Sequence, residues 1–164
     1  MTSPLRIGIV GLGRLGQRHA QALAFSTRNC VLTAACSPVE AERTYASTEL
    51  GIQQVYARFE DLLASPDVDA VVLVTPTSLH ADQAIAALQA GKHVFVEKPL
   101  ALNLPDCERV LAEAEKHPDL IAMVGFVRRF DPSYRAAQAS VAAGDIGRPF
   151  IVRSQTCDQN DPDG

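Results

Sequence analysis

The stretch GLGRLG, residues Gly11–Gly16, decides the fold of this chain because of the segments that flank it. Before it, Leu5–Val10 (LRIGIV) is a short β-branched run typical of a buried parallel strand. After it, residues 17–26 are predicted to form a helix. A GxGxxG pattern alone is weak evidence, and an ordinary glycine-rich turn is the alternative. Between a strand and a helix, however, it has the context that a dinucleotide-binding turn requires.

Each glycine of this motif has its own task in such a turn. Gly11 permits a tight bend, Gly13 lets a pyrophosphate approach the backbone, and Gly16 allows the helix to pack closely on the strand. The N–H groups at the start of the helix, near Arg14 and Leu15, then face the phosphates together with the positive end of the helix dipole. The motif therefore predicts a cofactor-binding turn.

The composition limits the class of protein. The chain has 164 residues, of which 47% are hydrophobic and 21% charged, as in one soluble globular domain or one domain and a fragment. The net charge of −4 argues against general nucleic-acid binding, and no apolar run is long enough for a membrane span. Arg6 interrupts any signal-peptide layout. The cysteines have no metal-ligand spacing, so we expect no metal site and idle thiols in a reducing, cytoplasmic setting.

Strand and helix patterns alternate along the chain. The predicted strands are Leu5–Val10, 31–36, 53–56, 68–74, 93–96 and 121–124, and the predicted helices fall within 17–26, 39–50, 59–64, 81–88, 104–114 and 131–144. Such alternation predicts an α/β fold with a doubly wound parallel sheet. Its cofactor crevice is expected at the carboxyl ends of the strands, where the strand order reverses. We assign residues 1–125 to this dinucleotide-binding domain.

The end of the chain does not follow this alternation of strands and helices. Residues 150–156 (FIVRSQT) are predicted to form a new strand, followed by the polar stretch 158–164. We interpret residues 126–164 as a helix and a strand that lead into a truncated α+β substrate domain. A simple edge strand on the existing sheet is the alternative.

Three longer stretches carry a family resemblance, together with GLGRLG. They are TPTSLHADQAIAALQAGKHVFVEKPLAL (75–102), GFVRRFDPSY (125–134) and GDIGRPFIVRS (144–154). The chain resembles the Gfo/Idh/MocA oxidoreductases over essentially its whole length, with the inositol 2-dehydrogenase-like branch most similar. The resemblance implies a Rossmann-type domain that binds NAD or NADP. It also implies hydride transfer to or from a cyclic polyol or sugar such as myo-inositol, and a homo-oligomer at full length.

The EKP motif is the most specific part of the resemblance. It implies that Lys98 lies beside the nicotinamide and holds the substrate hydroxyl, where a cation favours deprotonation. It also implies that Glu97 binds the nicotinamide ribose and that the bond to Pro99 is often cis. A surface lysine and a salt-bridge glutamate are the alternatives.

The resemblance assigns further residues to the cofactor. It places Thr75, Pro76 and Thr77 along the dinucleotide, although they are also consistent with a plain loop. His80 is expected near the nicotinamide, with a structural histidine at a helix start as an equal alternative. Arg128 is expected to contact the cofactor or a polyol or anionic substrate, unless it simply pairs with a carboxylate.

Ser37 departs from the pattern of an NAD site, which usually has Asp or Glu here for the ribose 2′-hydroxyl. Without a carboxylate, weak discrimination between NAD and NADP is expected. Arg14 and Arg43 are candidate partners of a 2′-phosphate, or else solvated helix charges.

The resemblance also leads us to expect an aspartate and an acid/base histidine in a second domain, beyond Gly164. The other reading of the chain is a non-catalytic dinucleotide-binding module or sensor subunit.

Overall fold

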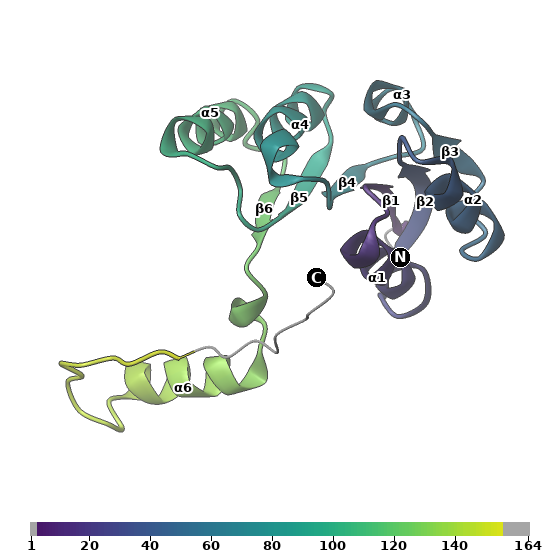
Figure 1. Ribbon diagram of the computed structural model, residues 1–164. Helices are drawn as coiled ribbons and strands as arrows, with labels where there is room; N and C mark the ends of the chain where they lie inside the picture. Colours follow the sequence, from purple (N-terminus) through teal and green to yellow (C-terminus); the bar gives the residue numbers. More distant parts are fainter. Residues whose placement is uncertain (1–2, 156–164) are drawn as a thin grey trace. The chain divides into compact units, whose positions relative to one another are not determined.

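Strands and helices alternate through most of the chain in the computed structural model, which describes residues 3–155 (Figure 1). The order is β1 (Leu5–Val10), α1 (Arg14–Phe25), β2 (Cys30–Cys36), α2 (Glu40–Thr48), β3 (Gln54–Tyr56), α3 (Phe59–Leu63), β4 (Ala70–Leu73), α4 (Thr77–Gln89), β5 (His93–Glu97), α5 (Leu104–Glu115), β6 (Ala122–Gly125), the 3-10 turn η1 (Val127–Arg129) and α6 (Pro132–Ala143). Within residues 3–155, no helix combines the length and the apolar character that a membrane span needs.

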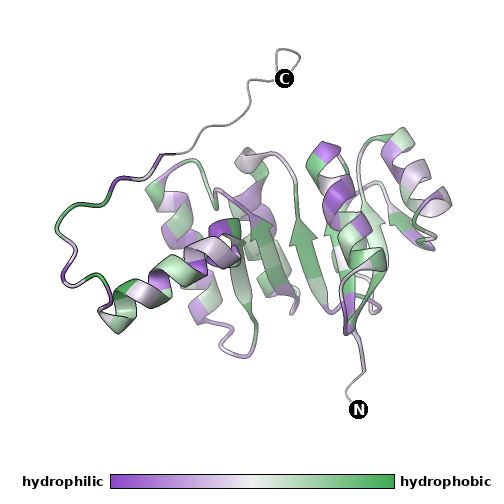
Figure 2. Cartoon of the chain, turned by 90° about the horizontal axis from the view of Figure 1, so that it is seen from below, coloured by the Kyte–Doolittle hydropathy of each residue, from purple (hydrophilic) through white to green (hydrophobic). Residues whose placement is uncertain are grey.

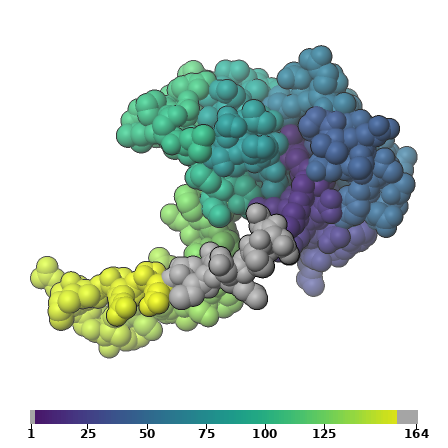
Figure 3. All heavy atoms as spheres, viewed as in Figure 1, coloured from purple at the N-terminus to yellow at the C-terminus, as the bar shows by residue number. Residues whose placement is uncertain are grey.

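The strands form one parallel sheet with the order β3-β2-β1-β4-β5-β6. This confirms the predicted doubly wound α/β fold of Rossmann type. The strand order reverses between β1 and β4, which lie side by side at the centre of the sheet. In Figure 3 the purple atoms of the first residues accordingly lie between the blue β2–β3 half and the teal β4–β5 half.

The central strands are apolar on both faces because helices cover both faces. In β4, Ala70 and Val72 belong to a core shared with Ala20 of α1 and Ala46 of α2. The alternate residues of β4 belong to a second core, built with α3, α4 and α5. Figure 2 shows the strands as a green, hydrophobic layer between more polar helices. The continuous apolar run that predicted this strand is thus explained by burial on both sides.

The chain divides into two compact units, the first ending at Gly125 and the second beginning at Phe126. The second unit contains η1 and α6. Asp131 caps α6, because its Oδ1 accepts from the Ser133 N–H at 2.9 Å and the Tyr134 N–H at 3.3 Å. The helix ends at Gly144, which has a left-handed φ of 80°. The helix predicted within residues 131–144 is confirmed.

The strand predicted at residues 150–156 is wrong for residues 150–155, which have no regular secondary structure, and Thr156 lies outside the described residues. An extended segment becomes a strand only by exchanging hydrogen bonds with a neighbouring strand. The six strands of the described sheet all lie within residues 5–125.

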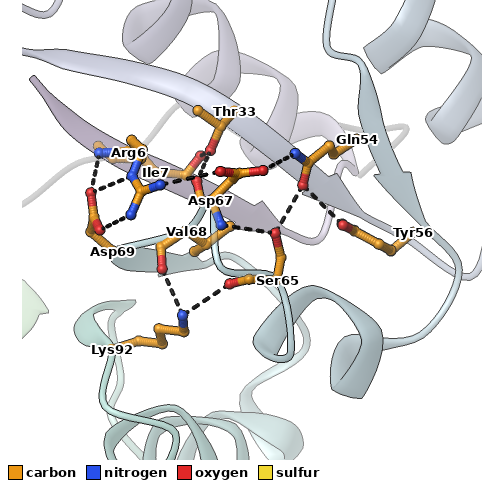
Figure 4. Close-up of polar contacts among 10 residues, drawn as sticks. All are labelled: Arg6, Ile7, Thr33, Gln54, Tyr56, Ser65, Asp67, Val68, Asp69 and Lys92. Carbon is orange, nitrogen blue, oxygen red and sulfur yellow. Dashed lines mark hydrogen bonds and ion pairs between the residues drawn. The ribbon is translucent and has the colours of Figure 1, made fainter.

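A polar network braces the amino edge of the sheet, where β1, β4 and β5 begin (Figure 4). The Arg6 guanidinium donates to both carboxylate oxygens of Asp69, at 3.0 and 2.7 Å, and the Arg6 backbone N–H donates to the same carboxylate at 2.9 Å. The Lys92 ammonium donates to the carbonyl oxygens of Ser65 and Val68, at 3.0 and 2.7 Å. These bonds tie the start of β1 to the loops that lead into β4 and β5.

We expect Asp69→Asn to lower the melting temperature at pH 7 by about 2–6 °C, because a charge-assisted pair is replaced by a weaker neutral contact. Hydrogen bonds from Arg6 lower the pKa of the Asp69 carboxyl to about 2. A carboxyl with a depressed pKa in the folded state stabilises the fold above its unfolded pKa and loses this effect as the pH falls through the folded one.

The difference in melting temperature between the two proteins should therefore be full above about pH 5, shrink as the pH falls, and vanish only below about pH 2. Thermal unfolding followed by circular dichroism at several pH values measures it. Asp82→Asn, which removes a carboxylate from the exposed pair with Arg109, is the matched control. A difference that stays constant down to pH 2 would rule out the titration of Asp69 as its source.

Candidate functional site

The turn between β1 and α1 fits tightly between the ends of neighbouring strands. Gly11 has a φ of +87°, and a Cβ atom on it would lie 2.5 Å from the carbonyl oxygen of Val74, which follows β4. The Gly11 N–H donates to the carbonyl oxygen of Cys36 at the end of β2, at 2.9 Å. Both the conformation and the space therefore require glycine here.

Gly16 and Gly13 differ in what surrounds them. A Cβ on Gly16 would collide with the Gly11 carbonyl oxygen at 2.1 Å, so Gly16 allows α1 to pack against the turn. A Cβ on Gly13 would meet nothing closer than the Glu42 Oε1 atom, at 4.0 Å. Gly13 thus faces open space, which a ligand can fill.

The first turn of α1 suits an anion. Within the described structure, Gly13 is the N-cap of α1, no side chain caps the helix, and no acidic residue lies in its first turn. The first N–H groups of a helix lack partners within the helix, and its dipole favours negative charge there. The open space at Gly13 and this helix end together fit the pyrophosphate of a dinucleotide.

A cleft of about 620 Å³ opens beside this turn, at the carboxyl ends of β1, β2 and β4. It lies where the strand order reverses, as expected for this fold. Residues from the end of β1 and the glycine turn, from the ends of β2 and β4, from the segment after β3, and from helices α2 and α4 line it: Val10, Gly11, Leu12, Gly13, Cys36, Ser37, Pro38, Val39, Glu42, Ala57, Phe59, Val74, Thr75, Pro76, Leu79 and Gln83.

Five of the residues predicted for the cofactor are among those that line the cleft: Gly11, Gly13, Ser37, Thr75 and Pro76. Two others, Arg14 and Leu15, begin α1 beside the turn, and Thr77 is the first residue of α4. The Thr75 hydroxyl donates to the Gln83 side-chain oxygen at 2.6 Å, which holds the loop after β4 against α4. The structure thus brings the glycine turn and this loop to one cleft.

Cys36 lines the same cleft but is buried, with 3% of its surface exposed. Burial, with the nearby carboxylates of Glu60 and Asp61, raises the pKa of its thiol to about 11. At neutral pH the thiol therefore stays protonated and is a poor nucleophile. Within residues 3–155, no three His, Cys, Asp or Glu side chains are grouped so that they would hold a metal ion.

His80 lies inside the molecule, with 1% of its surface exposed. Its Nδ1 lies 2.8 Å from the carbonyl oxygen of Pro99, and its Nε2 lies 2.8 Å from that of Thr75. The ring therefore joins the loop after β4 to the loop after β5. Both contacts fit the alternative of a structural histidine at the helix start, and a position of His80 near the nicotinamide stays a prediction.

The EKP turn follows β5. Glu97 Oε1 lies 2.8 Å from the His19 Nε2 atom of α1, and Glu97 Oε2 accepts from the Lys98 backbone N–H at 3.0 Å. The Lys98–Pro99 peptide bond is cis, and the Lys98 side chain belongs to an exposed residue. His19 was not among the predicted site residues, although it lies three residues after Gly16, on the same side of α1.

Arg128 belongs to the second unit, and its contacts there are local. Its Nη1 atom lies 3.5 Å from the Asp131 Oδ2 atom, and its guanidinium lies over the Tyr134 ring, 5.1 Å from the ring centre. These are the carboxylate pairing and packing that were the alternative to a ligand-binding role.

The fold and the glycine turn define a dinucleotide-binding domain of Rossmann type. The family model described as an oxidoreductase family with an NAD-binding Rossmann fold, Gfo/Idh/MocA, matches residues 5–126. The chain belongs to this family, which confirms the predicted family and a nicotinamide dinucleotide, NAD or NADP, as its cofactor.

The relatives include inositol dehydrogenases. The chain is 40% identical to the NAD⁺-dependent scyllo-inositol 2-dehydrogenase of Bacillus subtilis over 162 residues, which are 99% of this chain and 47% of that protein. A solved structure of scyllo-inositol dehydrogenase from Lactobacillus casei, with NAD(H) and scyllo-inositol bound, is 44% identical and superposes with a TM-score of 0.86, covering 88% of this chain and 42% of that one.

A 3-ketoreductase from Actinomadura kijaniata, solved with TDP-benzene and NADP, is 30% identical with a TM-score of 0.77, covering 86% of this chain and 43% of that one. The chain spans about half the length of the curated relatives that it matches.

Proposed function

We propose that this chain binds a nicotinamide dinucleotide in the cleft beside Gly13 and forms the cofactor half of an oxidoreductase that acts on a cyclic polyol or sugar. Inositols are the first substrates to consider, because the B. subtilis and L. casei relatives are named for scyllo-inositol. The observation that carries the proposal is the open space at Gly13, which faces an uncapped helix end.

Each part of the cofactor is bound by residues at the end of a different strand of the sheet. Gly13 and the first N–H groups of α1 hold the pyrophosphate, and the end of β2 at Ser37 holds the adenosine ribose. The loop of Thr75 and Pro76 runs along the dinucleotide. Because the carboxyl ends of parallel strands meet at one edge of the sheet, the EKP turn after β5 serves the nicotinamide end, with Glu97 at its ribose.

The nicotinamide, when bound, supplies the hydride acceptor. Lys98 holds the substrate hydroxyl with its ammonium group and stabilises the negative charge that develops on that oxygen. The Glu97 carboxylate accepts a bond from the Lys98 backbone N–H and contacts His19, which fixes the turn that carries Lys98. We further propose that a second half, of the size that the relatives possess, supplies the remaining substrate contacts and a proton acceptor.

Calorimetric titration of the purified 164-residue chain tests the cofactor part. We expect saturable binding of NADH or NADPH with a dissociation constant of about 1–100 μM, an ordinary range for such ligands. We expect no binding of S-adenosylmethionine, because this adenosyl cofactor contains a sulfonium group and no pyrophosphate for the glycine turn to hold. Tight binding of S-adenosylmethionine, or no binding of either dinucleotide, would contradict the proposal.

A further inference from the structure

A carboxylate reaches the end of β2 from a helix. Ser37 follows β2 directly and is buried, with 1% of its surface exposed. Its Oγ atom accepts a hydrogen bond from the Val39 N–H at 3.1 Å and lies 2.5 Å from the Glu42 Oε2 atom. Because an ionised carboxylate can only accept hydrogen bonds, the Ser37 hydroxyl donates its proton to the Glu42 Oε2 atom. Ser37 thus anchors the side chain of Glu42.

The other oxygen of the same carboxylate faces the glycine turn. Glu42 Oε1 is the atom 4.0 Å from the position of a Cβ on Gly13, and Glu42 lines the cleft. The neighbouring Arg43 donates through Nη1 to the backbone carbonyl oxygen of Ser37 at 2.8 Å. One negative charge is therefore held between the end of β2 and the turn that fits the pyrophosphate.

We propose that Glu42 selects NAD over NADP, performing from α2 the task that an acidic residue at the strand end performs in other NAD sites. The inference rests on the proposed function, since it requires the adenosine ribose at the end of β2. A ribose 2′-hydroxyl donates to the carboxylate, whereas a 2′-phosphate has no proton for it at neutral pH and is repelled by its charge.

This geometry reverses the weak discrimination expected from Ser37 alone. The sequence shows a serine where a carboxylate is usual, while the folded chain places a carboxylate five residues further on against that serine. A Ser37→Asp substitution would put a second carboxylate against Glu42. The variant to make is therefore at Glu42.

The test compares the dissociation constants of NADH and NADPH for the 164-residue chain by calorimetry. We expect the wild-type chain to favour NADH at least about tenfold, and Glu42→Gln to bring the two constants within about threefold of each other. Glutamine keeps an oxygen for the Ser37 hydroxyl but loses the charge. Ser37→Ala keeps the charge and removes its anchor, so its ratio should lie between the two.

Glu40→Gln is the matched control, because Glu40 lies in the same first turn of α2 but is exposed and does not line the cleft. It should leave the ratio unchanged, and circular dichroism should show that all variants are folded. A wild-type preference for NADH that survives Glu42→Gln overturns the inference and leaves the proposed function standing. A wild-type preference for NADPH overturns it too. Binding of neither cofactor is instead the failure of the proposed function.

Discussion

Replacing Gly13 by valine is expected to weaken NADH binding at least about a hundredfold, a loss of about 2.7 kcal/mol, while the chain stays folded. A Cβ atom on Gly13 meets nothing closer than the Glu42 Oε1 atom, at 4.0 Å, so the backbone has room for a side chain at this position. A pyrophosphate that must approach the Gly13 backbone does meet it. Calorimetric titration gives the affinity, and thermal unfolding gives the stability.

Gly16→Val provides the contrast that makes this result specific. Its Cβ would collide with the Gly11 carbonyl oxygen, which is backbone and cannot move aside without displacing the turn. We therefore expect Gly16→Val to lower the stability of the fold itself, whereas Gly13→Val lowers the affinity for NADH. Unchanged NADH affinity in a folded Gly13→Val protein would remove Gly13 from the site.

In a full-length enzyme that contains this domain, Lys98→Ala is expected to lower kcat about 10²–10³-fold, the range typical of removing one group that stabilises negative charge developing on an oxygen. The affinity for NADH should change less than about threefold, because the proposed contact of Lys98 is with the substrate hydroxyl. Lys98→Arg keeps the charge but not the compact ammonium, and should recover only part of the rate. Steady-state kinetics with myo-inositol and scyllo-inositol measure kcat.

Lys92 offers the matched control, since it lies at the opposite end of β5 and its ammonium is bound to two backbone carbonyl oxygens. Lys92→Ala should lower the melting temperature and leave kcat nearly unchanged. The two lysines thus separate a chemical role from a structural one within seven residues of chain. A Lys98→Ala enzyme with full activity would exclude Lys98 from catalysis.

The fold was largely predictable from the sequence because its signals are local. The apolar run around Val71 reports burial on both faces, and Asp131 with Pro132 marks the start of α6 before any contact is known. The expected strand at residues 150–155 failed for the complementary reason: an apolar, extended composition does not supply the neighbouring strand that its backbone must bond.

The site was predictable where one residue performs one task in one turn. Gly11 and Gly16 were predictable because the motif itself encodes the backbone geometry that requires glycine, and the structure shows the close approaches that it implies. Glu42 and His19 were not predicted because each contacts a partner outside its own helix: Glu42 contacts Ser37, and His19 contacts Glu97. No spacing rule connects such residues, and only the packed sheet brings them together.

The network around Arg6 and Asp69 has a consequence for anyone who wishes to redesign this domain. It lies at the amino edge of the sheet, and the cleft lies at the carboxyl edge. Five residue steps along β1, from Leu5 to Val10, put roughly 16 Å between them. Substitutions so far apart without shared partners usually have additive energies. Substitutions that stabilise the fold at the amino edge can therefore be combined with substitutions that change the ligand preference at the carboxyl edge.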